Sequence, residues 1–574
     1  MEKSYTPISL WRDFDPESTP LNSRLIRQDN VDGIKVGFYT FCGDKKDKQS
    51  TRVLAGVAYK HEKKKMPVII IVNPFERIND DLLVTWAKMG YLAISIDYLG
   101  ESERHPGNMT VYPECLSFAN FDQAKDNLTN VYGDAKHTCW YQWTLNTRRA
   151  VTFAKSFENA DIENIGIYSI REGNIIVLQA LATDSRIKAG AVMYGNLWEN
   201  VEQEIQPEDV ITDPKTLQAK TDLLQNNVEW LAAISPQSYL SYIKQPFFTC
   251  IGTNSPSTDM DRTYDCLSRM SNIGQGMVLF APKAMNSLLS QYERNLEKWF
   301  SVQLMPSENK FDMREIDIKI TAEYRYGKVE IVSQYEGPHY QSANIYYCRD
   351  KMQLSGTRNW IQQSMEKRDG GGLAAQLRLF NKQTPIIAFC NITFRNGVTV
   401  SSNLLKFIPE KKFENRPLIT ERKTSIVYTG DDGIGDFTPM THDGTQKGRF
   451  VDEHLLSAAK GPFGIVGLCG TKMGTFAVGD DSMMINSNSL LMFDVYSKKA
   501  QTLDVYFVID WGKDSCTVFK HACLLDGGEN WQKISLAQNE FKDETGSKGL
   551  NFADSCVLCF ECDQEVIVNN VLFT

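Results

Sequence analysis

The chain has 574 residues, of which 42% are hydrophobic and 23% are charged, and its formal net charge is −9. This length exceeds what one hydrophobic core supports, so several domains are expected. The negative charge argues against nucleic-acid binding, and no apolar run reaches the roughly 20 residues of a membrane span. Thirteen cysteines without framework spacing, and a start without a signal-peptide pattern, indicate reduced thiols in a cytoplasmic protein.

Short apolar runs separated by helix-length stretches occupy the first 300 residues. Strand-like pieces at 34–41 and 53–59 come first. The buried runs that follow are 68–72, 92–97, 165–168, 189–193, 247–251 and 277–280. Nearly continuous apolar runs are typical of a mostly parallel sheet with helices on both faces. We therefore predict an α/β domain over residues 1–305.

Alternating hydrophobicity replaces these runs in the rest of the chain. It is visible at 316–322, 491–495 and 503–509, and 566–573 is a further predicted strand. Turn signals such as Asn396-Gly397 separate the segments. The pattern predicts two all-β sandwich domains, an Ig-like one at 306–415 and a jelly roll at 416–574.

One stretch, Ile165–Ala180, has the pattern of a strand, a tight turn and a helix. This is the setting of a nucleophile elbow, G-x-S-x-G. Laid on that frame, Ser169 takes the first glycine, Arg171 the nucleophile and Gly173 the last glycine. An arginine cannot attack a carbonyl carbon, because its guanidinium group stays protonated and has no usable lone pair.

Several segments carry a family resemblance: GYLAISIDYLGES (90–102), WYQWTLNTRRAVTF (140–153), IENIGIYSIREGN (162–174) and IGTNSPSTDMDRTYDCLSRM (251–270). With these, the first 300 residues resemble the α/β-hydrolase superfamily, in particular the acetyl xylan esterase and cephalosporin-C deacetylase-like group. The resemblance implies an α/β-hydrolase fold and a serine triad. In the last domain, GENWQKISLAQNEF and EVIVNNVLF resemble a galactose-binding or carbohydrate-binding sandwich.

The triad positions implied by this resemblance hold other residues. The nucleophile position holds Arg171, the acid position Ser255, and the histidine loop Pro282–Ser287 has Asn286. The seven histidines are at 61, 105, 137, 339, 442, 454 and 521, so none lies between 138 and 338. No catalytic residue is therefore expected, and a serine esterase triad is not present.

Two alternatives stay open at the elbow. Ser169 is either a displaced nucleophile or a strand-end hydroxyl bonded to the backbone. Arg171 with Glu172 either binds an anion or is ion-paired to Asp259 or Asp261 and fills the former pocket, because a buried guanidinium group needs a partner.

Metal sites have weaker signals. Cys556, Cys559 and Cys562 are spaced like cluster ligands, but the residues between them are strand formers, so no metal is expected there. The glycine-rich turn with Asp431, Asp432 and Asp436 is either a solvated turn or a structural calcium site. No other cofactor is predicted.

The combined prediction is a catalytically inactive hydrolase-fold protein, a pseudoenzyme, with a binding, scaffolding or assembly role. One alternative is an esterase of acylated saccharides that acts through relocated residues. The other is a carbohydrate-binding protein that uses the C-terminal module, in which Trp511 or Trp531 could stack on a sugar. The expected partners are a carbohydrate or another protein, and an oligomer is compatible with the sequence.

Overall fold

The chain forms two compact units in the computed structural model. The first comprises Met1–Cys250, Asp261–Val278 and Leu296–Arg314, and the second Ile251–Met260, Leu279–Asn295 and Glu315–Thr574. The structure describes all residues except 1–3, 47–48, 63, 102–109, 127, 132, 199–225, 256–257, 268–269, 271–275, 286–289, 306–310, 336, 352–354, 369–370, 445–455 and 514. The division into three domains at 305 and 415 stays a prediction.

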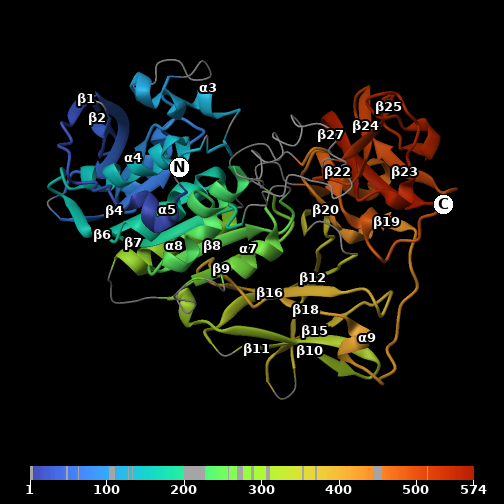
Figure 1. Cartoon of the computed structure of the whole chain (residues 1–574). Helices are drawn as coiled ribbons and strands as arrows, with labels where there is room; N and C mark the ends of the chain where they lie inside the picture. The colour runs from blue at the N-terminus through green and yellow to red at the C-terminus, as the bar shows by residue number, and fades with distance from the viewer. Residues whose placement is uncertain are drawn as a thin grey trace, which may run out of the picture. The chain divides into compact units, whose positions relative to one another are not determined.

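A nine-stranded sheet has the strand order β1-β2-β3-β5-β4-β6-β7-β8-β9. Its strands are β1 (Arg24–Val31), β2 (Ile34–Lys46), β3 (Gln49–Lys60), β4 (Met66–Val72), β5 (Leu92–Ile96), β6 (Ala160–Ile170), β7 (Ile187–Met193), β8 (Phe247–Gly252) and β9 (Gly276–Ala281). In the order of the sheet, neighbouring strands are parallel from β5 through β4, β6 and β7 to β8. Neighbouring strands are antiparallel from β1 through β2 and β3 to β5. Figure 1 shows β4, β6 and β7 side by side. Each predicted apolar run forms a strand.

Helices cover this sheet. They are α1 (Pro7–Trp11), α2 (Asp80–Lys88), α3 (Phe121–Ala124), α4 (Cys139–Ala154), α5 (Asn174–Thr183), α7 (Met260–Leu267) and α8 (Ser290–Leu304). Local sequence sets several of their ends. Asn79 accepts a hydrogen bond from the Leu82 backbone N–H at the start of α2, and Thr138 accepts one from Tyr141 at the start of α4.

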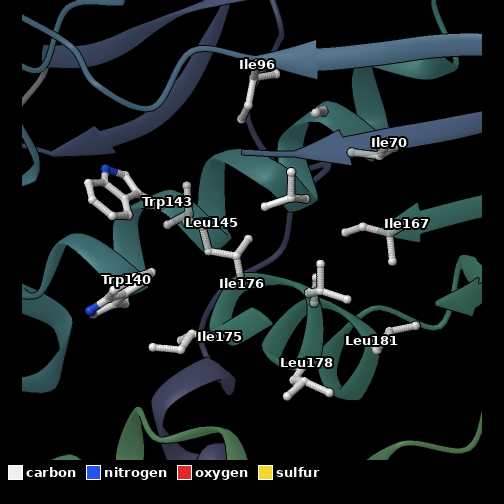
Figure 2. Close-up of a cluster of buried hydrophobic side chains, with 14 of the residues drawn as sticks. Ile70, Ile96, Trp140, Trp143, Leu145, Ile167, Ile175, Ile176, Leu178 and Leu181 are labelled. Atoms are coloured by element: carbon white, nitrogen blue, oxygen red, sulfur yellow. The ribbon is translucent and has the colours of Figure 1, made fainter. Parts of the chain in front are cut away.

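One face of the sheet packs against α4 and α5. Ile70, Ile96 and Ile167 belong to the same core cluster as Trp143 of α4 and Ile176 of α5. Figure 2 shows these side chains turned toward one another. Full burial of each aliphatic side chain contributes about 1.5–3 kcal/mol. This core holds the β6–α5 connection in place.

The opposite face packs against α2 and α8. Because side chains alternate along a strand, Tyr168 lies on the other side from Ile167. Its hydroxyl accepts a hydrogen bond from Trp86 Nε1 of α2 at 2.7 Å, and its ring lies 6.0 Å from that of Phe300 in α8. With helices on both faces of a mostly parallel sheet, the predicted α/β class of the N-terminal half is confirmed.

The second unit contains three antiparallel sheets. The first has the order β10-β11-β15-β14 and the second β13-β12-β16-β17, with β18 on β16. Their strands are β10 (Ile318–Arg325), β11 (Lys328–Tyr335), β12 (Tyr340–Arg349), β13 (Ile361–Ser364), β14 (Glu366–Lys367), β15 (Leu373–Leu377), β16 (Ile386–Phe394), β17 (Thr399–Ser401) and β18 (Leu405–Phe407), followed by α9 (Pro409–Lys412). The all-β class predicted for this region is confirmed.

The third sheet is arranged around one long strand, β27 (Val557–Phe573). The first part of β27 pairs with β24 and its last part with β23, and β22 pairs with both parts. The other strands of this sheet are β19 (Ile426–Tyr428), β20 (Phe437–Thr438), β21 (Ser457–Lys460), β22 (Val466–Thr475), β23 (Leu490–Tyr496), β24 (Gln501–Ile509), β25 (Thr517–Leu525) and β26 (Gln532–Ala537). The all-β prediction holds here too, while the jelly-roll topology stays a prediction.

The state of the cysteines and the apolarity of the helices are both described by the structure. All thirteen cysteines are free thiols. No helix in the described part of the chain combines the length and apolarity that a membrane crossing requires.

Candidate functional site: the β6–α5 elbow

The connection between β6 and α5 has the sharp geometry of an elbow. β6 ends at Ile170, one 3-10 turn covers Arg171–Gly173, and α5 begins at Asn174. Arg171 at the tip has a φ of 62°. An L-residue in this left-handed region costs about 1–2 kcal/mol, so packing must hold it there.

Two glycines make the elbow possible. A Cβ atom at Gly173 would lie 2.6 Å from Cβ of Ser169 and 2.8 Å from the Val72 carbonyl oxygen. A Cβ atom at Gly195 would lie 2.7 Å from the Arg171 carbonyl oxygen. Neither position has room for a side chain, because real Cβ atoms do not approach other heavy atoms so closely. The sequence therefore retains the steric requirements of the motif while Arg171 occupies its tip.

The Arg171 side chain is half-buried. Its Nε is enclosed without a hydrogen-bond acceptor, and within the described part of the chain the guanidinium group forms no ion pair. Glu172, the next residue, is exposed. An unpartnered buried donor costs about 1–3 kcal/mol. The Arg171 Nε is therefore able to donate a hydrogen bond to an acceptor from outside the described residues.

Ser169 lies inside the sheet. It is paired with Val72 of β4 on one side and Val192 of β7 on the other, and its side chain is 0% exposed. Its hydroxyl oxygen has no hydrogen-bond partner among the described residues. The predicted bond from this hydroxyl to the backbone is therefore not formed there. A carbonyl substrate has no access to an oxygen in this position.

The loop predicted to carry the catalytic acid lies in the second unit and is packed against another turn. Ser255 is 3% exposed. Next to it, Asn254 Nδ2 donates hydrogen bonds to the carbonyl oxygens of Gly356 at 2.9 Å and Arg358 at 2.8 Å. The Met260 backbone N–H donates to Ser355 Oγ at 3.3 Å. Asp259 belongs to the second unit and Asp261 to the first.

The loop predicted to carry the histidine is described only in part. Asn286 lies outside the described residues. Lys283 in the same loop forms an ion pair with Asp436 at 3.2 Å. His105 and His454 also lie outside the described residues.

The two described histidines of the first unit lie in different places. His61 follows β3, which is antiparallel to β5 with Ala58 opposite Ala93. It therefore lies at the amino edge of the parallel strands, whereas the elbow lies at their carboxyl edge. His137 ends a 3-10 turn before α4 and packs against the ring of Phe118 at 5.6 Å.

The loop after β4, where the resemblance to hydrolases implies an oxyanion hole, is held by side-chain contacts. Asn73 Nδ2 donates to Glu76 Oε2 at 2.7 Å, and the Phe75 ring packs 5.4 Å from Phe121 and 6.1 Å from Trp143. Pro74 has no backbone N–H to offer. The loop contains no glycine, so close backbone donors have to come from Asn73 or Phe75.

A buried acid at the same sheet edge was not singled out from the sequence. Asp97 follows β5 and is 2% exposed. Its Oδ1 accepts a hydrogen bond from the Leu99 backbone N–H at 3.2 Å, while its Oδ2 has no partner among the described residues. Burial raises the pKa of this carboxyl group to about 6. The only signal in the sequence is an acid directly after an apolar run.

Two of the three calcium candidates, Asp432 and Asp436, are engaged in other contacts. Asp432 Oδ2 accepts from the Thr429 backbone N–H at 2.8 Å, and Asp436 accepts from Lys283 and Asn359. Asp431 is exposed. The described residues contain no group of three or more His, Cys, Asp or Glu side chains placed to hold a metal ion.

The cysteine run and the tryptophans belong to the protein interior. Cys556 and Cys559 lie in one hydrophobic cluster and Cys562 in another. Trp511 is 3% exposed and donates through Nε1 to the His442 carbonyl oxygen. Trp531 is half-buried and donates to the Pro462 carbonyl oxygen at 3.2 Å.

No protein-family model matches the chain, and no curated protein is significantly similar to it. Among solved structures, the chain is similar to an acetyl xylan esterase from a Paenibacillus species, with 17% identity, a TM-score of 0.38 and coverage of 50% of this chain and 91% of that one. It is also similar to acetyl xylan esterase 1 from a Thermoanaerobacterium species (14% identity, TM-score 0.36, 50% and 89% covered). A third is a cold-adapted esterase from an Arctic intertidal metagenomic library (12% identity, TM-score 0.33, 48% and 97% covered).

Proposed function

We propose that this chain is a hydrolase-fold protein that does not hydrolyse esters and instead binds an anionic group at the β6–α5 elbow. The observation that carries the proposal is Arg171, held at the elbow tip with a φ of 62° and with an Nε that no described residue accepts from. A protonated guanidinium group is a poor nucleophile and a strong ligand for carboxylate or phosphate.

The absence of ester hydrolysis rests on chemistry and burial. Acyl transfer needs a nucleophile with a base within hydrogen-bond reach. Arg171 occupies the tip, and Ser169 is enclosed between β4 and β7. Of the described histidines in the first unit, His61 lies at the opposite edge of the sheet. These features support the non-catalytic interpretation over an esterase with relocated residues.

The anion-binding role rests on the charge and the helix that follows. The start of α5 has no side-chain cap and no acidic residue in its first turn. The partial positive charge of a helix N-terminus favours anions, and Arg171 lies directly before it. We further propose a cytoplasmic protein, since all thirteen cysteines are free.

The hydrolysis part is tested with p-nitrophenyl acetate and the full chain. We expect no turnover above background for the wild type or for Arg171→Ser, because the variant gains a hydroxyl group while the loop 282–287, the histidine position of the resemblance, contains no histidine. Turnover that disappears in Ser169→Ala would overturn the non-catalytic interpretation. Turnover gained by Arg171→Ser would reveal a base elsewhere in the chain.

The anion part is tested by titrating acetate and inorganic phosphate at constant ionic strength. We expect one of the two to raise the melting temperature in a saturable manner, because a ligand that binds only the folded state stabilises it. Arg171→Gln, of similar length but without charge, should weaken this binding about tenfold or more. Equal binding by wild type and Arg171→Gln would exclude the elbow as the anion site.

A further inference from the structure

A cavity of about 710 Å³ lies within the second unit. Its wall comes from the loop after β9, from β12 and β13, and from the segment between β19 and β20. Residues that line it include Lys283, Tyr346, Asn359, Gln362 and Asp436. The volume lies within the range of roughly 300–1,000 Å³ that small-molecule sites occupy. The cavity is independent of the elbow, since all its lining residues belong to the second unit.

The cations of the cavity wall are each neutralised by a carboxylate. Lys283 Nζ lies 3.2 Å from Asp436 Oδ1, Arg349 Nη2 lies 2.7 Å from Asp480 Oδ1, and Arg378 Nε lies 2.7 Å from Glu421 Oε2. The remaining lining acid, Asp432, accepts hydrogen bonds from Thr429. No cation in this set is left to neutralise a ligand's phosphate or carboxylate. The cavity wall therefore disfavours an anionic ligand.

The polar groups nevertheless have unused hydrogen-bonding capacity. Asp436 accepts one bond on each oxygen, from Lys283 Nζ and from Asn359 Nδ2 at 3.3 Å. Each carboxylate oxygen has a second acceptor site, the lysine has two more donors, and the amide oxygen of Asn359 is an acceptor. A hydroxyl group both donates and accepts, so neighbouring hydroxyls on one ring match this arrangement of a carboxylate, an ammonium and an amide group.

An aromatic side chain adds an apolar surface. Tyr346 stacks on Phe389 with ring centres 5.3 Å apart and planes at 19°, which holds its ring in one orientation. Gln362 lies directly opposite Tyr346 on β13, and its exposed amide bonds no other described residue. Paired residues on neighbouring strands lie on the same face of the sheet, so a ring and an amide are adjacent. A sugar ring can present its C–H groups to the Tyr346 ring and its hydroxyl groups to the Gln362 amide.

The backbone at Lys283 is held in an unfavourable conformation. Its φ is 57°, and its N–H donates a hydrogen bond to Thr253 Oγ1 at 2.9 Å. A non-glycine residue in the left-handed region costs about 1–2 kcal/mol, and such strain concentrates at ligand-binding positions. The ammonium group of the same residue lies beside Asp436.

We propose that this cavity binds a neutral saccharide, with Asp436, Lys283 and Asn359 bonding its hydroxyls and Tyr346 packing against its ring. This site goes beyond the anion-binding elbow and does not depend on it. The ligand class follows from balanced charges, spare donors and acceptors, and an immobilised aromatic ring in a cavity of small-molecule size.

The test is calorimetric titration of the full chain with xylobiose, cellobiose, maltose and lactose, and with the anionic sugar glucuronate. We expect at least one neutral disaccharide to bind and glucuronate to bind more weakly than that disaccharide. Absence of binding across the four neutral disaccharides, or preferential binding of glucuronate, would overturn the proposal.

Saccharide affinities of variants test whether the ligand binds in this cavity. Asp436→Asn should weaken binding about tenfold or more and Gln362→Ala severalfold, because hydrogen bonds to charged groups contribute more than neutral ones. Lys319→Gln, which removes an exposed ion pair away from the cavity wall, is the matched control and should bind like wild type. Unchanged affinity in both Asp436→Asn and Gln362→Ala would exclude this cavity. Gln362 is exposed, so its variant separates loss of contact from loss of folding.

Arg171→Gln separates the two proposals. It should retain saccharide affinity while losing anion binding, so the failure of one site leaves the other measurable. Loss of saccharide binding in Arg171→Gln would place the sugar at the elbow and overturn the cavity assignment.

Discussion

Two arginines, Arg171 of the first unit and Arg349 of the second, differ in how their donors are satisfied. In the first unit, Asp97 Oδ2, Ser169 Oγ and Arg171 Nε are enclosed without a hydrogen-bond partner among the described residues. In the second unit, Arg349 donates to both oxygens of Asp480 and to the Arg378 carbonyl oxygen. Arg171 Nε has no acceptor among the described residues, whereas Arg349 donates to three acceptor atoms.

This difference has a functional meaning. A buried unpaired group costs about 1–3 kcal/mol, and the cost is removed by water, a ligand or protonation. A buried ion pair whose hydrogen bonds are all formed is part of the structural frame and does not need a ligand. We infer that the first unit keeps a guanidinium group available for an anion, whereas the second unit uses paired charges to shape a neutral cavity.

The largest effect is expected from Asp480→Ala. Both Asp480 and Arg349 are almost fully buried, with side chains 1% and 3% exposed. Removing one partner leaves a buried charge without compensation, which costs about 3–5 kcal/mol. Urea denaturation measures the loss. Asp317→Ala removes an ion pair whose side chains are 72% and 71% exposed and should change stability little. Equal effects of the two variants would show that the buried pair does not stabilise the second unit.

A pH-dependent effect is expected from Asp97→Asn. The folded-state pKa of about 6 lies above the ordinary value of 3.8, so the folded chain holds this proton more tightly. Stability from this group is therefore present below about pH 4 and is lost as the pH rises to about 6, by about 3 kcal/mol. Asparagine removes the titration. The variant should exceed the wild type at pH 8 and approach it at pH 4 in thermal unfolding. A stability difference between Asp97→Asn and the wild type that does not change with pH would contradict the raised pKa of Asp97.

A smaller effect is expected from Gly173→Ala. The added methyl group would lie 2.8 Å from the Val72 carbonyl oxygen, and backbone atoms move only at a cost. Overpacking of this kind costs about 1–3 kcal/mol. Gly549→Ala is a useful comparison, because neither glycine has a positive φ and the new Cβ at Gly549 would meet only Ser547 Oγ, at 3.9 Å. If both variants lose the same stability, the elbow is not sterically closed.

The smallest effect is expected from Arg171→Gly compared with Arg171→Ala. Glycine adopts a φ of 62° at no steric cost, whereas alanine keeps the strain of about 1–2 kcal/mol. Both variants remove the unpartnered Nε. Thermal unfolding should therefore rank Arg171→Gly above Arg171→Ala. The reverse order would mean that the elbow stores no backbone strain.

Much of the fold was predictable because its signals are local. The runs 68–72 and 165–168 are apolar enough to be strands in any context, and they lie within β4 and β6. The strand–turn–helix pattern of the elbow was equally readable, since Gly173 follows a β-branched run and precedes an apolar helix. The cavity was not predictable, because Lys283, Asn359 and Asp436 are separated by more than seventy residues from one another.

The sequence alone determined the identity of the residue at the elbow tip, and with it the chemistry available there, because a guanidinium group stays protonated in any fold. It also determined the strands of the large sheet through their hydrophobic pattern. Only the tertiary structure decided that Arg171 Nε has no acceptor in the described part of the chain, that Ser169 is enclosed between β4 and β7, and that Lys283 is neutralised by Asp436. Pairing and enclosure depend on which distant segments meet, and local pattern does not contain that information.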